Sequence, residues 1–400
     1  MILIRNAGVH APEPLGVNDI LIIDDRIASI AAHLECPRLP GRACEVIDAG
    51  GLLALPGMVD PLVHVIGGGG EAGFGSRTRP LDPDYALRHG ITSLVGCLGT
   101  DAITRSHADL LATCRALRDH GIGAWCLTGA YGLPAPTLTG SVESDLVLIP
   151  EIIGIGEIAL GDHRGSQPDL RRLVEAVAEA RRGALLAGKR GTALLHLGDG
   201  GGAFELIERA VAETDLPRGQ FYPTHCNRSE ATLEAACAFG RAGGNIDLTT
   251  STTPALIDAG EVPAARALAL ALQAGVEPQG MTLSSDGQAS LPDYDVEGEL
   301  QSSHVADPAS LWHSVRGAIV EHGVELGAAL ASVSANPARI MGLKDCGRLR
   351  PGLRADVLLA DPETLELTMT ISKGRVCWQH EELAPRCAEQ AGRRGSSVTS

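Results

Sequence analysis

The chain has 400 residues, 44% of them apolar, and carries a formal net charge of −16. This length suits one large α/β domain with an appendage, and the apolar share is ordinary for a globular protein with a sizeable core. The negative charge, with no basic block beyond a short GRR near the end, argues against nucleic acid as a partner but leaves room for a small anionic substrate.

Two further features bear on the compartment. No apolar run reaches the ~18 residues that a membrane-spanning helix needs, and the opening MILIRNAGVH does not resemble a secretory signal. The ten cysteines stand singly, with no CxxC pair, which is typical of reduced, mostly buried thiols. We therefore expect a cytoplasmic protein that has no membrane partner.

Short strand-like runs open and close the chain. Residues 1–55 contain several stretches with strand character, separated by turn residues, and residues 345–380 contain more of them. We predict that 1–55 and 345–380 together form one small β-sandwich domain. The tail at 381–400 is polar and rich in small residues, so we expect it to be disordered.

Strand-like and helix-like segments alternate between these ends. The strand-like runs, in chain order, are GMVDPLVHV, ITSLVGCLG, GAWCLTGAY, IIGIGEIAL, TALLHLGD, QFYPTHCN, GNIDLTTS and MTLSSDG. Helix-like runs such as LRRLVEAVAEARRGALLAG, GAFELIERAVAE and ATLEAACAFGRAG lie between them. About eight strand–helix units in succession predict an α/β fold, a (β/α)8 TIM barrel over residues 56–344.

Several of these strands end in side chains that bind metals, at the rim where TIM barrels carry their chemistry. The candidates at the strand ends are His64, Tyr131, Glu157, His196, His225 and Asp286. One histidine after a strand is usually structural. Three histidines and two carboxylates on one rim suit a divalent metal such as zinc.

Eight motifs resemble those of the amidohydrolase superfamily and, within it, of the β-aspartyl (isoaspartyl) dipeptidases. They are, in order, VIGGGGEAG, GCLGTD, LTGAYGLP, TGSVESD, DHRGS, HLGD, PTHCNR and TLSSDG. The closing GRLRPGLRADVLLAD resembles the superfamily's returning β-sandwich strand, so the resemblance covers about residues 1–380. It implies a metal-dependent hydrolase of a small substrate, assembled as a homo-oligomer.

The implied metal site departs from the family pattern at two positions. The family's dinuclear zinc site uses two histidines on the first strand, a carboxylated lysine on the fourth, one histidine on each of the next two and an aspartate on the eighth. This sequence supplies His64, His196, His225 and Asp286. Leu62 stands in place of the first histidine, and Glu157 stands in place of the lysine.

These departures change what each metal position can bind. Glu157, His196 and His225 supply three ligands, the catalytic zinc pattern, so we expect one tightly bound Zn²⁺. Because leucine offers no lone pair, we expect a second metal, at His64 and Asp286, to be weak or absent. Glutamate is shorter than carboxylated lysine and would bridge two metals only if the backbone shifts. One residue added before it, in IIGIGE, would supply such a shift.

The matching motifs also imply a pocket for a small zwitterion. By resemblance, Glu71 takes the free α-amino group of the β-linked aspartyl residue. Arg228 pairs with its α-carboxylate through a planar fork that lysine cannot copy. Arg164 takes the C-terminal carboxylate, and Ser290 helps to position the substrate.

Catalysis is expected at Asp286 and Tyr131. Asp286 would take a proton from the attacking water and pass it to the leaving amine, and Tyr131 would donate to the oxygen on which charge develops. Gly69 and Gly70 belong to a glycine run that lets backbone N–H groups approach the ligand. Cys97 is either a buried thiol, which we favour, or one more ligand, as in some D-aminoacylases of the superfamily.

Three functions stay open. We favour a hydrolase of β-aspartyl dipeptides or of a close dicarboxylate amine analogue. The altered ligands Leu62 and Glu157 motivate a second hypothesis, in which a similar small substrate undergoes ring closure, deamination or deacylation of an N-acyl amino acid. The third hypothesis is a non-catalytic binding protein, against which the retained ligands argue.

Overall fold

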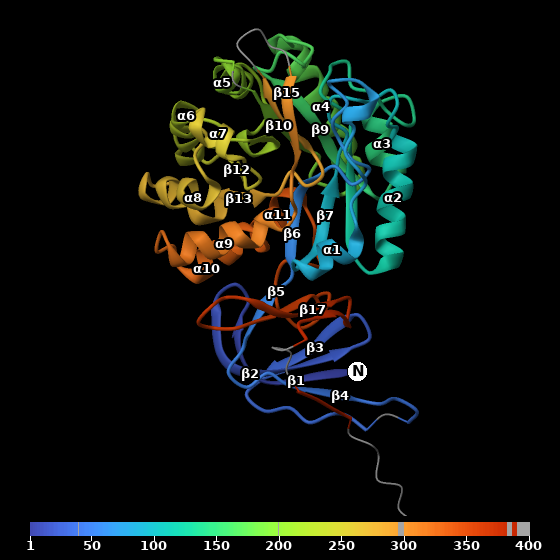
Figure 1. Cartoon of the computed structure of the whole chain (residues 1–400). Coiled ribbons are helices and arrows are strands. Elements are labelled where there is room, and N and C mark those ends of the chain that lie inside the picture. Colours follow the sequence, from blue (N-terminus) through green and yellow to red (C-terminus); the bar gives the residue numbers. More distant parts are fainter. Residues whose placement is uncertain (39, 199, 295–299, 382–385, 390–400) are drawn as a thin grey trace, which may run out of the picture. The chain divides into compact units, whose positions relative to one another are not determined.

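The computed structural model describes residues 1–38, 40–198, 200–294, 300–381 and 386–389. The chain divides into two compact units: one is Met58–Gly347, and the other combines Met1–Gly57 with Arg348–Ser400. Figure 1 shows their elements, coloured along the chain. Among the described residues, no helix has both the length and the apolar character needed to cross a bilayer.

Eight parallel strands form the first unit's barrel. They are β6 (Met58–Val63), β7 (Ile91–Gly96), β8 (Gly123–Thr128), β9 (Ile152–Leu160), β10 (Thr192–Leu197), β11 (Phe221–Thr224), β12 (Ile246–Thr249) and β13 (Met281–Ser284). Strands β6 to β11 make one sheet in sequential order, and β12 pairs with β13. Backbone hydrogen bonds from Cys226 N to Asp247 O (3.0 Å) and from His64 N to Gly287 O (2.8 Å) join the two sheets. The predicted TIM-type barrel is therefore confirmed.

Helices follow the strands and surround the barrel (Figure 1). They are α1 (Pro83–Arg88), α2 (His107–His120), α3 (Val142–Leu148), α4 (Leu170–Ala187), α5 (Ala203–Glu213), α6 (Glu230–Arg241), α7 (Pro254–Asp258), α8 (Ala264–Gln273), α9 (Ser310–Val320), α10 (Leu326–Ser332) and α11 (Ala335–Met341). Helix α4 buries Leu173, Val177 and Ala180, which share one face because they are three to four residues apart. Asp169 caps its first turn, and Gly188 ends it in the left-handed conformation.

Shorter elements complete this unit. Strand β14 (Ser290–Tyr294) pairs antiparallel with β15 (Leu300–Val305) directly after the last barrel strand. The described connections also contain 3-10 turns at η1 (Phe74–Ser76), η2 (Arg218–Gln220) and η3 (Pro278–Gly280).

Strands from both chain ends form the second unit. They are β1 (Ile2–His10), β2 (Pro14–Ile23), β3 (Arg26–Ala31), β4 (Glu45–Asp48), β5 (Leu53–Pro56), β16 (Val357–Ala360), β17 (Leu367–Ser372), β18 (Arg375–Gln379) and β19 (Arg386–Glu389). The main sheet runs β18-β17-β16-β5-β1-β2-β3. It branches at β1, which pairs with β4 near its start and with β5 further along. The strands are one hydrogen-bonded network, and their packing as a two-layered sandwich remains a prediction.

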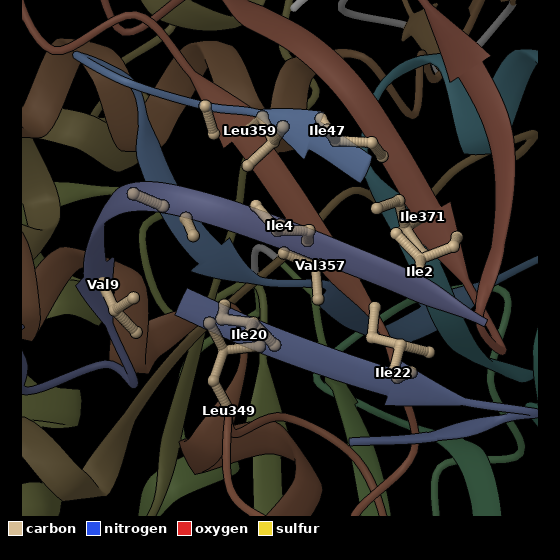
Figure 2. Close-up of a cluster of buried hydrophobic side chains, with 14 of the residues drawn as sticks. Ile2, Ile4, Val9, Ile20, Ile22, Ile47, Leu349, Val357, Leu359 and Ile371 are labelled. Atoms are coloured by element: carbon tan, nitrogen blue, oxygen red, sulfur yellow. The ribbon is translucent and has the colours of Figure 1, made fainter. Parts of the chain in front are cut away.

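Alternating side chains give this unit two apolar clusters. On β1, Ile2 and Ile4 belong to one cluster and Leu3 to the other, because neighbouring residues of a strand face opposite sides. Strand β2 repeats the pattern with Ile20 and Ile22 in the first cluster. Figure 2 shows side chains from β1, β2 and β16 converging in this first cluster, which combines branched aliphatic residues with alanines and Met369.

Two expectations differ from the structure. Cys36 and Cys44 form a disulfide, because the loop between β3 and β4 brings their Cα atoms to 6.2 Å, so these two are not the free thiols that we expected. The tail predicted to be disordered contains β19, whose backbone pairs with β4. Residue 381 is the only other part of that tail within the described residues.

An extra residue in β9 sets the position of Glu157. On β10, the paired residues Ala193 and Leu195 are two apart, whereas their partners on β9, Ile155 and Ile158, are three apart. The register shifts over the segment that holds Glu157. A bulge of this kind re-aims the side chain that it carries. The backbone shift that IIGIGE indicated is therefore present.

Substitution of Gly156 should destabilise the barrel. Gly156 has a φ of +151°, and a Cβ there would lie 2.8 Å from both Cβ and the carbonyl oxygen of Leu194. We expect Gly156→Ala to lower the free energy of unfolding by about 1–3 kcal/mol, through strain and overpacking. The midpoint of urea unfolding measures this. Gly201→Ala is the matched control, since nothing lies within 4 Å of its Cβ. Equal midpoints would contradict the prediction.

Candidate metal and substrate site

The carboxyl ends of the barrel strands bring the predicted metal ligands together. His64 directly follows β6, His225 directly follows β11, and Asp286 comes two residues after β13. Glu157 and His196 lie inside β9 and β10, near their ends. His225 and Asp286 have positive φ angles of 60° and 53°. This conformation costs a non-glycine residue about 1–3 kcal/mol and persists only where the surroundings impose it.

Glu157 lies at the centre of this group. Its Oε1 is 2.7 Å from His196 Nδ1 and 3.2 Å from His225 Nε2. All three side chains are buried. One ligand atom from each lies within 4.8 Å of the others, so the three can hold one metal ion. These are the residues that the sequence indicated as the tight metal position.

The remaining ring nitrogens of both histidines also have partners. His196 Nε2 lies 3.0 Å from Asp162 Oδ2, and His225 Nδ1 lies 2.6 Å from Thr249 Oγ1. Asp162 additionally accepts hydrogen bonds from two nitrogens of Arg164, at 3.0 and 2.6 Å. Partners of this kind fix the orientation and tautomer of metal-binding histidines.

The charges inside the group stabilise one another. Burial alone would raise the pKa of Glu157, but the charge and hydrogen bond of His196, followed by the hydrogen bond of His225, hold it well below its usual value. Burial lowers the pKa of His225 to about 4, and the neighbouring His196 adds to this shift. Near neutral pH the carboxylate is ionised and the His225 ring is neutral, which are the forms that bind metals.

A second group of ligand atoms lies beside the first. His64 Nε2 is 3.7 Å from Glu157 Oε2 and 3.2 Å from Asp286 Oδ1, while His64 Nδ1 is 3.8 Å from Cys97 Sγ. His64, Cys97 and Glu157 each offer a ligand atom within 4.8 Å of the others. Burial raises the pKa of the Cys97 thiol to about 11.

Two buried oxygen atoms are suited to a cation. Glu157 Oε2 and Asp286 Oδ1 accept no hydrogen bond from the described part of the chain, although both are shielded from solvent. Buried oxygens without a donor are rare because losing hydration costs free energy. Together with the inward-facing histidine nitrogens, they make a donor set that fits a divalent metal such as zinc.

The Tyr131 hydroxyl also faces this group, at 2.9 Å from His196 Nδ1. Burial, with the charge of Glu157 adding to it, raises the pKa of Tyr131 well above its usual value. The phenol therefore stays protonated and can donate a hydrogen bond. The guanidinium of Arg164 lies 5.4 Å from the centroid of its ring.

A cavity of about 310 Å³ opens over the metal ligands. All four residues predicted to bind the polar groups of the substrate line it: Glu71, Arg164, Arg228 and Ser290. Glu71 accepts a hydrogen bond from Ser290 Oγ at 3.2 Å and lies 3.6 Å from Arg164 Nη1. The cavity therefore presents both signs of charge within reach of one small molecule.

The glycine run follows the cavity wall. Gly69 has a φ of +69°, and a Cβ there would lie 2.6 Å from a backbone oxygen, so only glycine fits. Gly70 is not among the residues that line the cavity. The buried Arg105 donates to the carbonyl oxygens of Ile66 and Gly68 and holds the run in place.

Sequence signals for the supporting residues are weaker. Asp162 stands in the DHR motif but received no role, and Thr249 ends β12 without a distinctive neighbour. Thr100, which donates to Glu71 Oε1 at 3.0 Å, was also missed. Hydroxyl residues at strand ends are common, so only their distance to a histidine or carboxylate identifies these positions.

Known proteins place this arrangement in context. Residues 175–377, half of the chain, match the amidohydrolase family. A β-aspartyl dipeptidase from Fervidobacterium islandicum AW-1, solved in complex with the dipeptide β-Asp-Leu, is 38% identical with a TM-score of 0.86, covering 94% of this chain and 96% of that one. A dihydroorotase from Pelotomaculum thermopropionicum is 26% identical over 89% of this chain and 88% of its own length.

A dihydropyrimidinase from Brevibacillus agri NCHU1002 shares the fold at 15% identity, with a TM-score of 0.66 over 96% of both chains. The family match spans half of the sequence, and the 38% identical relative aligns with nearly all of it. This chain therefore belongs to the amidohydrolase family.

Proposed function

We propose that this protein is a zinc-dependent hydrolase that cleaves the isopeptide amide of β-aspartyl dipeptides or of a close dicarboxylate amine analogue. Hydrolysis of a C–N bond is what family membership supports, and the substrate is our proposal. One observation carries it. A cavity whose lining includes Arg164, Arg228 and Glu71 opens over the buried Glu157–His196–His225 group. The sequence is 38% identical to that of a β-aspartyl dipeptidase solved with β-Asp-Leu.

Glu157, His196 and His225 would hold one zinc ion tightly. Bound there, it would lower the pKa of a water toward ~7 and polarise the amide carbonyl. Neighbouring side chains hold two of these ligands in a fixed orientation. Asp162 and Thr249 orient the two rings through their outer nitrogens.

Proton transfer falls to Asp286. Its Oδ1 is buried and accepts no hydrogen bond from the described residues, so it can accept a proton from the attacking water and pass it to the leaving amine. Tyr131 keeps its proton and donates to the carbonyl oxygen as negative charge develops there. Both side chains line the same cavity as His196 and His225.

Recognition follows from the charges around the cavity. A β-aspartyl dipeptide carries two carboxylates and one ammonium group. Arg228 would take the α-carboxylate of the aspartyl residue, and Arg164, already fixed by Asp162, would take the C-terminal carboxylate. Glu71 would take the ammonium group. Each of these three side chains carries the charge opposite to that of the substrate group assigned to it.

A second candidate function is another reaction on a similar small substrate. Two observations favour it: the similarity to a dihydroorotase, and the altered residues Leu62 and Glu157. The first set of test substrates should therefore include cyclic amides and N-acyl amino acids. If the protein turns over one of these compounds and cleaves no β-aspartyl dipeptide, the first function is wrong and this second function takes its place.

Metal content tests the proposed ligands. We expect about one tightly held zinc per chain after purification without chelator, because three buried ligands converge on one point. Glu157→Gln should lose this zinc, since an amide carries no charge to pair with the cation. Glu234→Gln, on the exposed side of α6, is the matched control. Elemental analysis measures both, and full zinc content in Glu157→Gln would rule out the site.

Removal of the proton acceptor should abolish turnover with the fold intact. We expect Asp286→Asn to lower kcat on β-Asp-Leu by about 10²–10⁴-fold, because asparagine cannot accept the proton of the water. Asp109→Asn, at an exposed position on α2, should leave kcat unchanged. Steady-state kinetics on both variants would refute this role for Asp286 if they give equal values.

Replacing the guanidinium of Arg228 with an ammonium group should weaken substrate binding. Arg228→Lys keeps the charge but removes the planar pair of donors, so we expect KM for β-Asp-Leu to rise about 10-fold or more. Arg172→Lys, exposed on α4, serves as the control. An unchanged KM in Arg228→Lys would show that this arginine does not bind the α-carboxylate.

A further inference from the structure

Asp60 is a buried carboxylate to which the proposed chemistry gives no role. It lies on β6, the first barrel strand, and is fully buried. Its Oδ1 accepts a hydrogen bond from Ser285 N at 3.1 Å, and its Oδ2 accepts one from Ser285 Oγ. Ser285 follows β13, the last barrel strand, and directly precedes Asp286. Asp60 therefore links the first strand to the segment that carries the proposed proton acceptor.

Ser285 is held through its main-chain and side-chain polar atoms. In addition to its two bonds with Asp60, its carbonyl oxygen accepts a hydrogen bond from Ser251 Oγ at 2.6 Å. Its hydroxyl oxygen also accepts one from Gly287 N at 2.9 Å, which lies on the other side of Asp286 in the chain. The residues before and after Asp286 are thus connected to each other and to Asp60 by hydrogen bonds.

The backbone of Asp286 depends on support of this kind. Its φ of +53° is unfavourable for a residue with a Cβ, and such a conformation persists only where the surroundings impose it. Ala289 N donates to Asp286 O at 3.0 Å, and the hydrogen bonds of Ser285 and Gly287 hold the two flanking residues. Because Asp286 Oδ1 accepts no hydrogen bond from the described residues, that oxygen does not itself anchor the conformation.

We propose that Asp60 is a positioning residue: through Ser285 it fixes the backbone at Asp286, so that Asp286 Oδ1 is placed to take the proton of the attacking water. The inference rests on the proposed function, in which Asp286 is the proton acceptor. Asp60 is not among the residues that line the cavity, so it acts without touching the substrate.

The protonation state of Asp60 does not decide this role. Burial raises the pKa of Asp60 to about 7, and hydrogen bonds from Ser285 and from Leu62 N oppose the shift. An oxygen of either the carboxylate or the neutral carboxyl group can accept from Ser285 N.

Steady-state kinetics on β-Asp-Leu with the full-length, zinc-loaded protein tests the proposal. We expect Asp60→Ala to lower kcat about 10–100-fold, because a small misplacement of a reacting group is costly. KM should stay within about 2-fold, because the loss falls on the chemical step and not on substrate binding. Ser285→Ala should lower kcat as well. The double variant should be no slower than the slower single variant, since both changes break the same link.

Two further variants separate positioning from general destabilisation. Asp19→Ala is the matched control: Asp19 is 2% exposed, lies in the other compact unit and accepts hydrogen bonds from Asn6 N and Leu34 N at 2.9 Å. This variant should lose stability and keep kcat. Asp60→Asn keeps an oxygen that can accept from Ser285 N, so it should recover most of the lost kcat. It also provides a test if Asp60→Ala does not fold.

Hydrogen exchange gives a readout that needs no turnover. Peptides covering residues 283–288 are followed by mass spectrometry in the wild type, Asp60→Ala, Asp60→Asn and Asp19→Ala. We expect faster exchange in this segment for Asp60→Ala, because the amide of Ser285 loses its acceptor and the segment opens more often. Exchange there should stay near the wild-type rate in Asp60→Asn and Asp19→Ala.

The outcomes distinguish this inference from the proposed function. A wild-type protein that does not cleave β-Asp-Leu overturns the proposed function, and exchange at 283–288 then decides whether Asp60 holds the segment. Unchanged exchange in Asp60→Ala overturns the role of Asp60. So does an unchanged kcat in Asp60→Ala and Ser285→Ala, an equal fall of kcat in Asp19→Ala, or additive losses in the double variant, while the proposed function stands in each of these cases.

Discussion

The barrel buries the carboxylate of Glu157 among three imidazoles. A buried ion of this kind is normally unfavourable, because it loses its hydration. Removing an ion from water costs several kcal/mol unless nearby groups replace the lost hydration. His196 and His225 lie at hydrogen-bonding distance from one oxygen of Glu157, and His64 lies beside the other. Each strand that carries one of these histidines is held in register by its neighbours, so the fold itself maintains the enclosure.

Asp162 links His196, a proposed metal ligand, to Arg164, a proposed substrate-binding residue. One of its oxygens lies against His196, and both accept hydrogen bonds from Arg164. Burial opposes ionisation of Asp162, but hydrogen bonds from His196 and Arg164 hold its pKa far below the usual value. The imidazole of His196 and the guanidinium of Arg164, which we propose to bind metal and substrate carboxylate, are thus fixed by one side chain. A shift of either would be transmitted to the other.

The sequence predicted the parts of the site that depend on local pattern. Apolar runs ending in His64, His196 and His225 predicted strands and a rim, and the structure places all three there. The distance between Cys97 and His64 was not predictable, because it depends on pairing between β6 and β7. The contacts of Asp162 and Thr249, and the disulfide at Cys36, likewise depend on where the loops and strands lie in space.

The extra residue in β9 has a consequence for how the site is completed. Because of this extra residue, the short side chain of Glu157 places its carboxylate at the centre of the metal-ligand group. Glu157 is encoded in the gene and needs no later modification, whereas a carboxylated lysine must capture dissolved carbon dioxide and can lose it again. The central anion of this site is therefore permanent from the moment the barrel closes, whatever the bicarbonate concentration around it.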